Sequence, residues 1–143
     1  MILIKEIYQE DYECCFKLDS ITIGLWSKSQ WKSEFKKKGV KVFALSLTRT
    51  LIGICVFHVV VDEAQINYFS ILKDYRREGY GSHLMYFSIE KCKQLNLKKL
   101  SLEVSEANLA GNKFYEYFDF LTVGKRKNYY KNGVDALLKE KLI

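Results

Sequence analysis

The segment RREGYGSH, residues 76–83, separates a predicted strand from a predicted helix. A helix N-terminus presents unpaired N–H groups and the positive end of the helix dipole, so it attracts anions. Gly79 and Gly81 have no Cβ atom, which allows the backbone to approach a phosphate closely. Arg76 and Arg77 can add charge-assisted hydrogen bonds to the same anion. The segment therefore predicts a strand–turn–helix unit that holds a phosphate group.

Two glycines separated by one residue are a weak signal when they stand alone. The spacing does not match the P-loop, GxxxxGK followed by Ser or Thr, and the third glycine of the GxGxxG motif is absent. A solvated basic turn that begins a helix is an equally good interpretation of residues 76–83. The remaining segments are needed to choose between the two.

Strand-like and helix-like patterns of apolar residues follow one another along the chain. Residues 98–105 alternate apolar and polar side chains, as strands do, whereas residues 83–95 place apolar side chains at helical spacing. Residues 40–47 and 51–61 are expected to form an antiparallel hairpin around a polar break. Strands are also expected at residues 2–7 and 65–72 and twice within 120–142, and helices at 11–18, 29–38 and 108–118. This order predicts a mixed α/β (α+β) fold.

Size and composition indicate one globular domain over residues 1–143. The chain has 143 residues, 48% of them hydrophobic and 28% charged, with no proline, and a chain of this length buries enough surface to fold alone. The longest apolar run, residues 51–61, is well short of the roughly 20 residues that cross a bilayer. Lys5 and Glu6 leave no room for the apolar part of a signal peptide. We therefore expect a cytoplasmic protein that does not enter a membrane.

Cysteine spacing and net charge narrow the choice of ligands only partly. Cys14, Cys15, Cys55 and Cys92 lack the spacing of a zinc site or a disulfide framework, so we expect structural thiols and no metal. The net charge of +6 favours an anionic partner. Nucleic acid, the ribosome and a nucleotide-like ligand all satisfy that condition.

Several segments together resemble one protein family. RREGYG fits the phosphate turn of the GCN5-related N-acetyltransferases (GNAT), which has Gln or Arg, two residues, Gly, one residue, and Gly or Ala. SLEVSEANLAGNKFYEYFDF and GKRKNYY resemble the RimI-type ribosomal-protein-alanine N-acetyltransferases; VVDEAQINYFSILKDY and, more weakly, LWSKSQW are also similar. The resemblance covers about half the chain, from Val59 to Tyr130. It implies the GNAT fold, a central mixed, mostly antiparallel sheet of about six to seven strands flanked by about four helices.

The resemblance also implies acetyl-CoA (coenzyme A) as the acetyl donor. Its pyrophosphate is expected on the turn, and its pantetheine arm is expected to pair with the predicted strand at residues 69–71. The residues that the resemblance assigns to this ligand are Phe69, Ser70, Ile71, Arg76, Arg77, Glu78, Gly79, Tyr80, Gly81, Ser82, Asn108 and Tyr115. Asn108 precedes a predicted helix, so it is also a natural N-cap.

Two residues match the catalytic pair of the family. Glu103 in LEV matches the general base, and Tyr115 in KFYEYF matches the tyrosine that protonates the departing thiolate. Acetylation of an amine requires both tasks, because a proton leaves the ammonium and one returns to the sulfur. A surface acid remains the alternative for Glu103, and core packing remains the alternative for Tyr115.

The acceptor side of the site is implied by aromatic residues. Tyr129 and Tyr130 match a strand that borders the acceptor N-terminus in the family. Trp26 or Trp31, from the segment LWSKSQW, is expected to shape the same pocket. A basic and aromatic cluster can instead stack on nucleic acid. Two departures from the family pattern accompany these matches. Asp119 replaces a glycine expected in a left-handed conformation, and Lys73 replaces a proline before the turn.

The combined pattern favours an enzyme that acetylates the N-terminal α-amine of a protein beginning with alanine, a small-subunit ribosomal protein, by direct attack in a ternary complex. We expect no stable nucleic-acid partner. Acetylation of a small amine or a lysine side chain remains a second interpretation. A non-catalytic acyl-CoA-binding or RNA-associated protein of the same fold remains a third.

Overall fold

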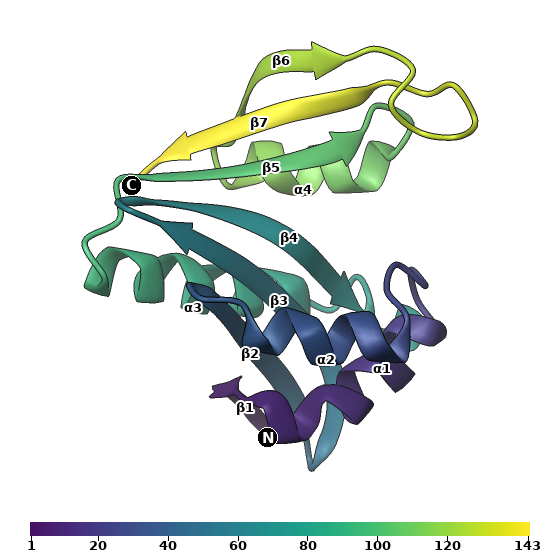
Figure 1. The fold of residues 1–143 in the computed structure, drawn as a ribbon, viewed down its shortest axis with the longest axis vertical. Helices are drawn as coiled ribbons and strands as arrows, with labels where there is room; N and C mark the ends of the chain where they lie inside the picture. Colours follow the sequence, from purple (N-terminus) through teal and green to yellow (C-terminus); the bar gives the residue numbers. More distant parts are fainter.

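The computed structural model describes residues 1–143 and contains one seven-stranded sheet with helices on both faces (Figure 1). The strands are β1 (Ile2–Ile7), β2 (Val40–Leu47), β3 (Thr50–Val60), β4 (Glu63–Ile71), β5 (Lys99–Ser105), β6 (Leu121–Arg126) and β7 (Ala136–Leu142). Their order across the sheet is β1-β2-β3-β4-β5-β7-β6, and only the β4–β5 pair is parallel. The expected mixed, mostly antiparallel sheet is confirmed.

Four α-helices cover the sheet, as predicted. Those on one face are α1 (Tyr12–Ser20) and α2 (Lys28–Lys36), and those on the other face are α3 (Tyr80–Gln94) and α4 (Leu109–Tyr117) (Figure 1). Two short 3-10 turns, η1 (Gln9–Asp11) and η2 (Lys73–Tyr75), precede α1 and the turn before α3. None of the helices combines the length and the apolar character that crossing a bilayer requires.

The sheet separates two hydrophobic cores. The larger core packs α3 and the end of α4 against apolar residues of β2 to β5, and the smaller core packs α1 and α2 against the opposite face. Alternation along β5 follows this division, because Leu100, Leu102 and Val104 are buried in the larger core while the residues between them are not. Side chains at the odd positions of β5 therefore point to the other face of the sheet.

β4 and β5 stay together for only part of their length. Their parallel register runs from Glu63 opposite Lys99 to Ile66 opposite Leu102, and no pairing follows. Figure 1 shows the two strands diverging beyond that point. Each keeps its other neighbour, β3 or β7, so the two halves of the sheet splay apart beyond this register, and we call this divergence the wedge.

The two departures from the family pattern fall at element ends. Asp119 has φ 65°, so the left-handed conformation expected at this position is confirmed. Its N–H donates to the Glu116 carbonyl at 2.9 Å and ends α4. Lys73 is the first residue of η2, which leads from β4 toward the glycine turn.

Candidate active site

The divergence of β4 from β5 leaves unpaired a strand edge that carries three predicted ligand-binding residues. Phe69, Ser70 and Ile71 lie on β4 beyond its last pairing with β5, and β3 is their only strand neighbour. The Ile71 carbonyl accepts a hydrogen bond from Arg76 Nε at 2.9 Å, which braces the chain that leads into the turn. An unpaired strand edge can bind an extended chain through main-chain hydrogen bonds. A pantetheine contact at these residues stays a prediction.

The turn before α3 presents a row of free N–H groups. The backbone N–H groups of Gly79, Tyr80, Gly81 and Ser82 donate to no acceptor in the protein, and the next one, of His83, donates to the Gly79 carbonyl at 3.1 Å. The positive end of the α3 dipole lies at the same place. Successive N–H donors at a helix start form a site suited to a phosphate. The turn therefore has the donors that the phosphate hypothesis requires.

The shape of this turn depends on two residues with left-handed backbone. Arg77 has φ 63° and Gly79 has φ 85°. That conformation costs a non-glycine residue roughly 1–2 kcal/mol, so the turn carries strain at Arg77. The charged groups of Arg77 and Glu78 form no ion pair within the protein. The Arg77 guanidinium therefore remains free to meet an anion.

Gly79 and Gly81 serve the turn in different ways. A Cβ atom on Gly79 would meet nothing within 4 Å, but φ of 85° disfavours any side chain there. A Cβ atom on Gly81 would lie 3.5 Å from Phe114 and 3.6 Å from Ile71, which are ordinary contact distances. The sequence predicted that both glycines keep space open for a phosphate. In the structure, a Cβ atom on Gly81 would point toward apolar side chains. Of the two glycines, Gly79 is the one whose backbone conformation favours glycine.

Glu103 lies on β5 and is not a solvated surface acid. Its side chain is 21% exposed, and its Oε1 lies 3.2 Å from Arg126 Nε. Because Leu102 and Val104 point into the larger core, Glu103 points to the opposite face of the sheet. The role of Glu103 as a base stays a prediction.

Tyr115 lies on α4 and is partly buried among aromatic rings. Its ring is 5.5 Å from that of Phe114 and 5.7 Å from that of Phe120, centroid to centroid. Burial raises the pKa of the Tyr115 hydroxyl well above its ordinary value, with a smaller contribution from the Cys55 thiol. The hydroxyl therefore stays protonated at neutral pH, and it donates to no other group in the protein. The Tyr115 side chain thus packs against aromatic rings and also has a hydroxyl that is free to donate a hydrogen bond.

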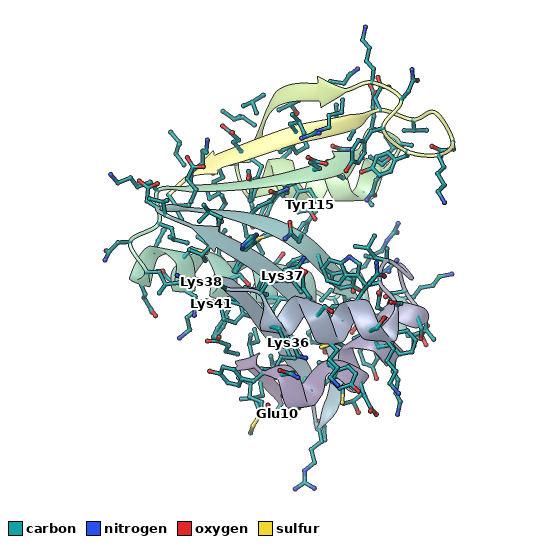
Figure 2. All side chains as sticks on the ribbon, in the orientation of Figure 1. Glu10, Lys36, Lys37, Lys38, Lys41 and Tyr115 are labelled. Carbon is teal, nitrogen blue, oxygen red and sulfur yellow. The ribbon has the colours of Figure 1, made fainter.

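Glu103 and Tyr115 approach the wedge from opposite faces of the sheet. Figure 2 shows Tyr115 on the α4 side of the sheet, near the place where β4 and β5 diverge. Glu103 points to the face covered by α1 and α2. No strand pairing joins β4 to β5 beyond Ile66 and Leu102, so the sheet is not continuous at this level. A substrate that contacts both side chains at this divergence stays a prediction.

Asn108 is the N-cap of α4. Its Oδ1 accepts a hydrogen bond from the Gly111 N–H at 2.9 Å, so the N-cap prediction is confirmed. Asn112 secures the same corner, because its Nδ2 donates to the carbonyls of Asn108 at 2.8 Å and Ser105 at 3.1 Å. A contact between Asn108 and acetyl-CoA stays a prediction.

A basic and aromatic cluster lies beside Glu103. The Arg126 guanidinium lies 5.6 Å from the centre of the Tyr129 ring, and the rings of Tyr129 and Tyr130 meet edge to face at 5.1 Å. Burial raises the pKa of Tyr130, and the charge of Glu103 raises it further. The effect of Glu103 indicates that the Tyr130 hydroxyl lies near the candidate base. The two tyrosines are positioned to line an acceptor pocket, which stays a prediction.

Trp26 and Trp31, the two tryptophans predicted to contact the acceptor, occupy different environments. Trp31 is fully buried, and its Nε1 donates to Asp19 Oδ2 at 2.9 Å. A direct contact between Trp31 and an acceptor would require the indole to leave this position, so the structure does not support that part of the prediction. Trp26 is partly exposed and packs on Trp31 at 4.8 Å and on Tyr68 at 5.5 Å. Trp26 is thus the tryptophan with surface available to a substrate.

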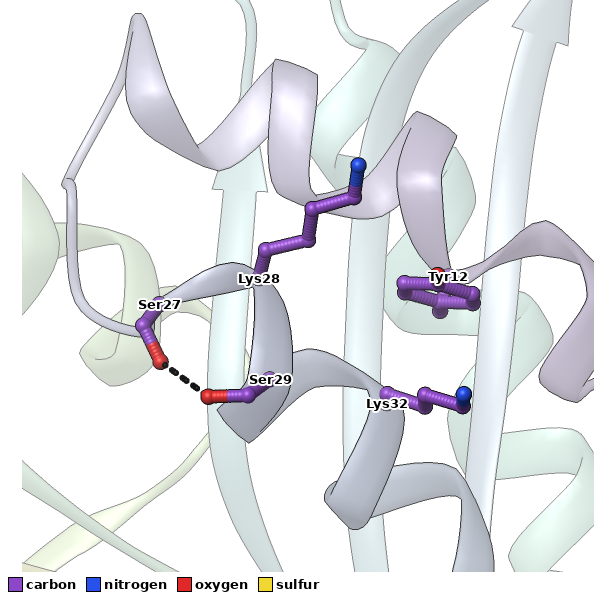
Figure 3. Close-up of a pocket in the computed structure, with 5 residues that line it drawn as sticks. All are labelled: Tyr12, Ser27, Lys28, Ser29 and Lys32. Carbon is purple, nitrogen blue, oxygen red and sulfur yellow. Dashed lines mark hydrogen bonds between the residues drawn. The ribbon is translucent and has the colours of Figure 1, made fainter.

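A pocket of about 440 Å³ lies between α1 and the start of α2, away from these residues (Figure 3). It is lined by Tyr12, Ser27, Lys28, Ser29 and Lys32. The two serine hydroxyls hydrogen-bond each other at 3.2 Å, and Ser27 already caps α2. None of the predicted site residues lines it, so this pocket is not the candidate active site.

Three residues near the site were not predicted from the sequence: Asp19, Tyr68 and Arg126. Asp19 is a fully buried carboxylate next to the loop between α1 and α2. Hydrogen bonds through Tyr68 and Ser70 connect it to β4. Arg126 was considered only as part of a basic cluster. A lone aspartate at the end of an amphipathic helix resembles a solvated residue, so no local signal distinguishes it.

Comparisons with known proteins agree with this geometry. Residues 2–120 match the model of the acetyltransferase (GNAT) family. The chain is 31% identical over 133 residues to a ribosomal protein bS18-alanine N-acetyltransferase of Haemophilus influenzae, covering 91% of this chain and 88% of the relative. It is 29% identical over 105 residues to the Escherichia coli K12 enzyme of that name, covering 73% and 70%.

A solved structure confirms the fold. The crystal structure of the ribosomal-protein-S18-alanine N-acetyltransferase from Escherichia coli superposes with a TM-score of 0.94 and 25% sequence identity. The superposition covers 100% of this chain and 94% of the other. The family match, the sequence relatives and the superposed structure all indicate the same acetyltransferase fold. The chain belongs to the GNAT acetyltransferase family.

Proposed function

We propose that this protein transfers the acetyl group of acetyl-CoA to the N-terminal α-amine of a protein that begins with alanine, a ribosomal protein of the small subunit. The observation that carries the proposal is the wedge between β4 and β5. It has an unpaired strand edge and free N–H groups at the start of α3, with Glu103 and Tyr115 on its two faces. The names of the relatives support the choice of acceptor.

The donor side of the wedge fits acetyl-CoA. The free N–H groups at Gly79 to Ser82 and the unpaired Arg77 can bind the pyrophosphate. The free edge of β4 at Phe69 to Ile71 can bind the amide-rich pantetheine arm. When bound, acetyl-CoA supplies a thioester carbonyl that an amine can attack. The structure contains no cluster of side chains suited to a metal ion.

The acceptor amine must be deprotonated before it attacks. Glu103 accepts the proton, the nitrogen forms a bond to the thioester carbon, and the carbon–sulfur bond breaks. The nitrogen loses its second proton to solvent as the amide forms, and the sulfur leaves as a thiolate that accepts a hydrogen bond from the Tyr115 hydroxyl. Its raised pKa makes complete transfer to a free thiolate, with an ordinary pKa of about 8.5, unfavourable. Hydrogen bonding to the developing charge is therefore the main contribution of Tyr115.

The acceptor side combines aromatic walls with one carboxylate. Tyr129, Tyr130 and Trp26 have exposed surface near it and can surround a small first residue. Glu103 supplies the negative charge that attracts an α-ammonium group within a protein of net charge +6. A free N-terminus is the ligand that this arrangement suits. The cytoplasmic location and the absence of nucleic-acid binding stay predictions.

The test is acetylation of synthetic peptides in the presence of acetyl-CoA, followed by mass spectrometry. Peptides that differ only in the first residue, alanine or leucine, and one alanine peptide with a blocked N-terminus form the panel. We expect the free alanine peptide to be acetylated fastest and the blocked peptide not at all. Glu103→Gln keeps the shape of the side chain and is the control for enzyme-dependent transfer. Acetylation of small polyamines in place of all peptides would favour the small-amine interpretation.

A further inference from the structure

Asp19 is a buried carboxylate whose charge is balanced by hydrogen bonds alone. It is fully buried at the end of α1 and lies within ion-pair distance of no lysine, arginine or histidine. Its two oxygens accept from the N–H groups of Leu25 (3.0 Å) and Trp26 (2.9 Å), the indole of Trp31 (2.9 Å) and the hydroxyl of Tyr68 (3.1 Å). A buried charge is costly unless it is satisfied in this way. The four donors therefore specify one arrangement around Asp19.

These donors come from three different elements. Leu25 and Trp26 belong to the loop between α1 and α2, residues 21–27, which we call the early loop. Trp31 belongs to α2, and Tyr68 belongs to β4. The Asp19 main-chain carbonyl also accepts from the Gly24 N–H at 2.7 Å. Asp19 is thus the residue that ties the early loop to both the helix after it and the sheet.

The connection continues to the strand expected to hold acetyl-CoA. Ser70 Oγ donates to the Tyr68 hydroxyl at 2.9 Å, and Tyr68 in turn donates to Asp19 Oδ1. Burial raises the pKa of Tyr68 well above its ordinary value, so the phenol keeps the proton that it donates. Ser70 lies on β4 beside the wedge. One chain of hydrogen bonds therefore runs from the wedge to the early loop.

Trp26 is the one large apolar side chain through which the early loop packs on the core. Ile21 is 72% exposed, Ile23 is 51% exposed and Leu25 is 49% exposed. Without the carboxylate, the N–H groups of Leu25 and Trp26 would lose their acceptor. The loop would then be free to adopt other conformations, and Trp26 would move with it.

We propose that Asp19 and Tyr68 are positioning residues that hold the early loop against β4, and that this placement sets how the acceptor peptide binds. The structural part of this inference stands on the hydrogen bonds alone. The effect on the acceptor rests on the proposed function. Neither residue touches the reacting atoms, so their loss should weaken acceptor binding more than it slows the chemical step.

Tyr68→Phe is the test, because it removes one hydroxyl and preserves the ring that packs on Trp26 and Trp31. We expect the acceptor KM to rise by roughly tenfold, the low end of the effect of one hydrogen bond to a charged group. kcat and the calorimetric affinity for acetyl-CoA should stay near their wild-type values. Tyr86→Phe, at an exposed tyrosine of α3, is the matched control and should change none of these quantities.

The two tryptophans give a readout that does not depend on activity. They are the only tryptophans in the chain, and both contact Tyr68. Acrylamide quenching of their fluorescence should increase in Tyr68→Phe and increase more in Asp19→Asn, where an amide replaces an acceptor oxygen. If Asp19→Asn does not fold, Tyr68→Phe and Ser70→Ala still test the chain of hydrogen bonds.

The outcomes separate the two proposals. Unchanged quenching in Tyr68→Phe would overturn the positioning role, and so would a parallel loss of acetyl-CoA affinity, which would indicate general destabilisation. A wild-type protein that acetylates no alanine peptide would instead overturn the proposed function. In that case the quenching comparison alone decides whether Asp19 holds the early loop.

Discussion

The glycine turn before α3 offers a pair of substitutions with opposite expected results. Gly79 has φ 85° with open space around its Cβ position, whereas a Cβ on Gly81 would make ordinary contacts at 3.5 Å and 3.6 Å. Gly79→Ala therefore tests conformation without steric interference. Gly81→Ala adds the same methyl group two residues later, inside the first turn of the helix, and is its control.

The expected magnitude follows from the backbone. An alanine at Gly79 costs roughly 1–2 kcal/mol in the left-handed conformation. The turn can avoid this cost only by moving the free N–H groups at Gly79 to Ser82 away from their present positions. When the turn moves, acetyl-CoA binding has to restore the strained conformation, and the corresponding loss of affinity is about five- to thirtyfold. Gly81→Ala should bind acetyl-CoA normally and raise stability by roughly 0.5–1 kcal/mol, because alanine favours helix.

Isothermal titration calorimetry with acetyl-CoA measures the affinities, and urea unfolding measures the stabilities. Sodium chloride should weaken binding to the wild-type protein, because phosphate contacts with charged donors are screened by salt. An unchanged affinity in Gly79→Ala would refute the assignment of the pyrophosphate to this turn. An equal loss in Gly81→Ala would refute the distinction drawn between the two glycines.

Three further substitutions have direct readouts. Tyr115→Phe should lower kcat by about a hundredfold and leave acetyl-CoA affinity unchanged; an unaltered kcat in steady-state assays would reduce Tyr115 to a packing residue. Arg126→Gln removes the ion pair to Glu103 at 3.2 Å, and because the arginine is exposed the change in unfolding free energy should be less than about 1 kcal/mol in urea titrations. Cys14 is the only exposed cysteine, and burial raises the pKa of Cys15 to about 12, so a thiol reagent at pH 8 should modify one cysteine rapidly and none in Cys14→Ser.

Features that depend on neighbouring residues in the chain were predictable from the sequence. The alternation of β5 follows from side chains at every second position, so Glu103 was placed correctly on the less buried face. The strand–turn–helix unit was also predicted, although α3 begins at Tyr80, inside the glycine turn, and not at His83. The left-handed backbone at Asp119 was predicted from the glycine that the family has there.

Features that depend on contacts across the fold were not predictable in the same way. Asp19 and Tyr68 are far apart in the chain, and nothing in either local segment indicates that they meet. Trp31 was assigned to an acceptor pocket because LWSKSQW resembles a segment of the RimI-type enzymes, but its indole is fully buried against the same carboxylate. The direction of a Cβ at Gly81 depends on Phe114 of α4 and could be read only from the assembled structure.

The choice between an N-terminal amine and a lysine side chain rests on the ease of deprotonation. An α-amino group has a pKa of about 7.7–8.0, and a lysine has a pKa of about 10.4. At pH 7 roughly one α-amine in ten is already a free nucleophile, against roughly one lysine in two thousand. The lysine therefore begins with a disadvantage of about 3 kcal/mol. Glu103 is the one candidate base in the site, and it is already paired with Arg126.

A single peptide with a free N-terminal alanine and one internal lysine compares the two amines under identical conditions. We expect the acetyl group on the α-amine, located by fragmentation in the mass spectrometer. Raising the pH from 7 to 9 should narrow the preference, because the α-amine is then fully deprotonated while the free lysine fraction continues to grow. A peptide with a blocked N-terminus controls for lysine labelling. Acetyl transfer mainly to the lysine at pH 7 would contradict the preference for an N-terminal amine. It would require a stronger base than one carboxylate that is paired with an arginine.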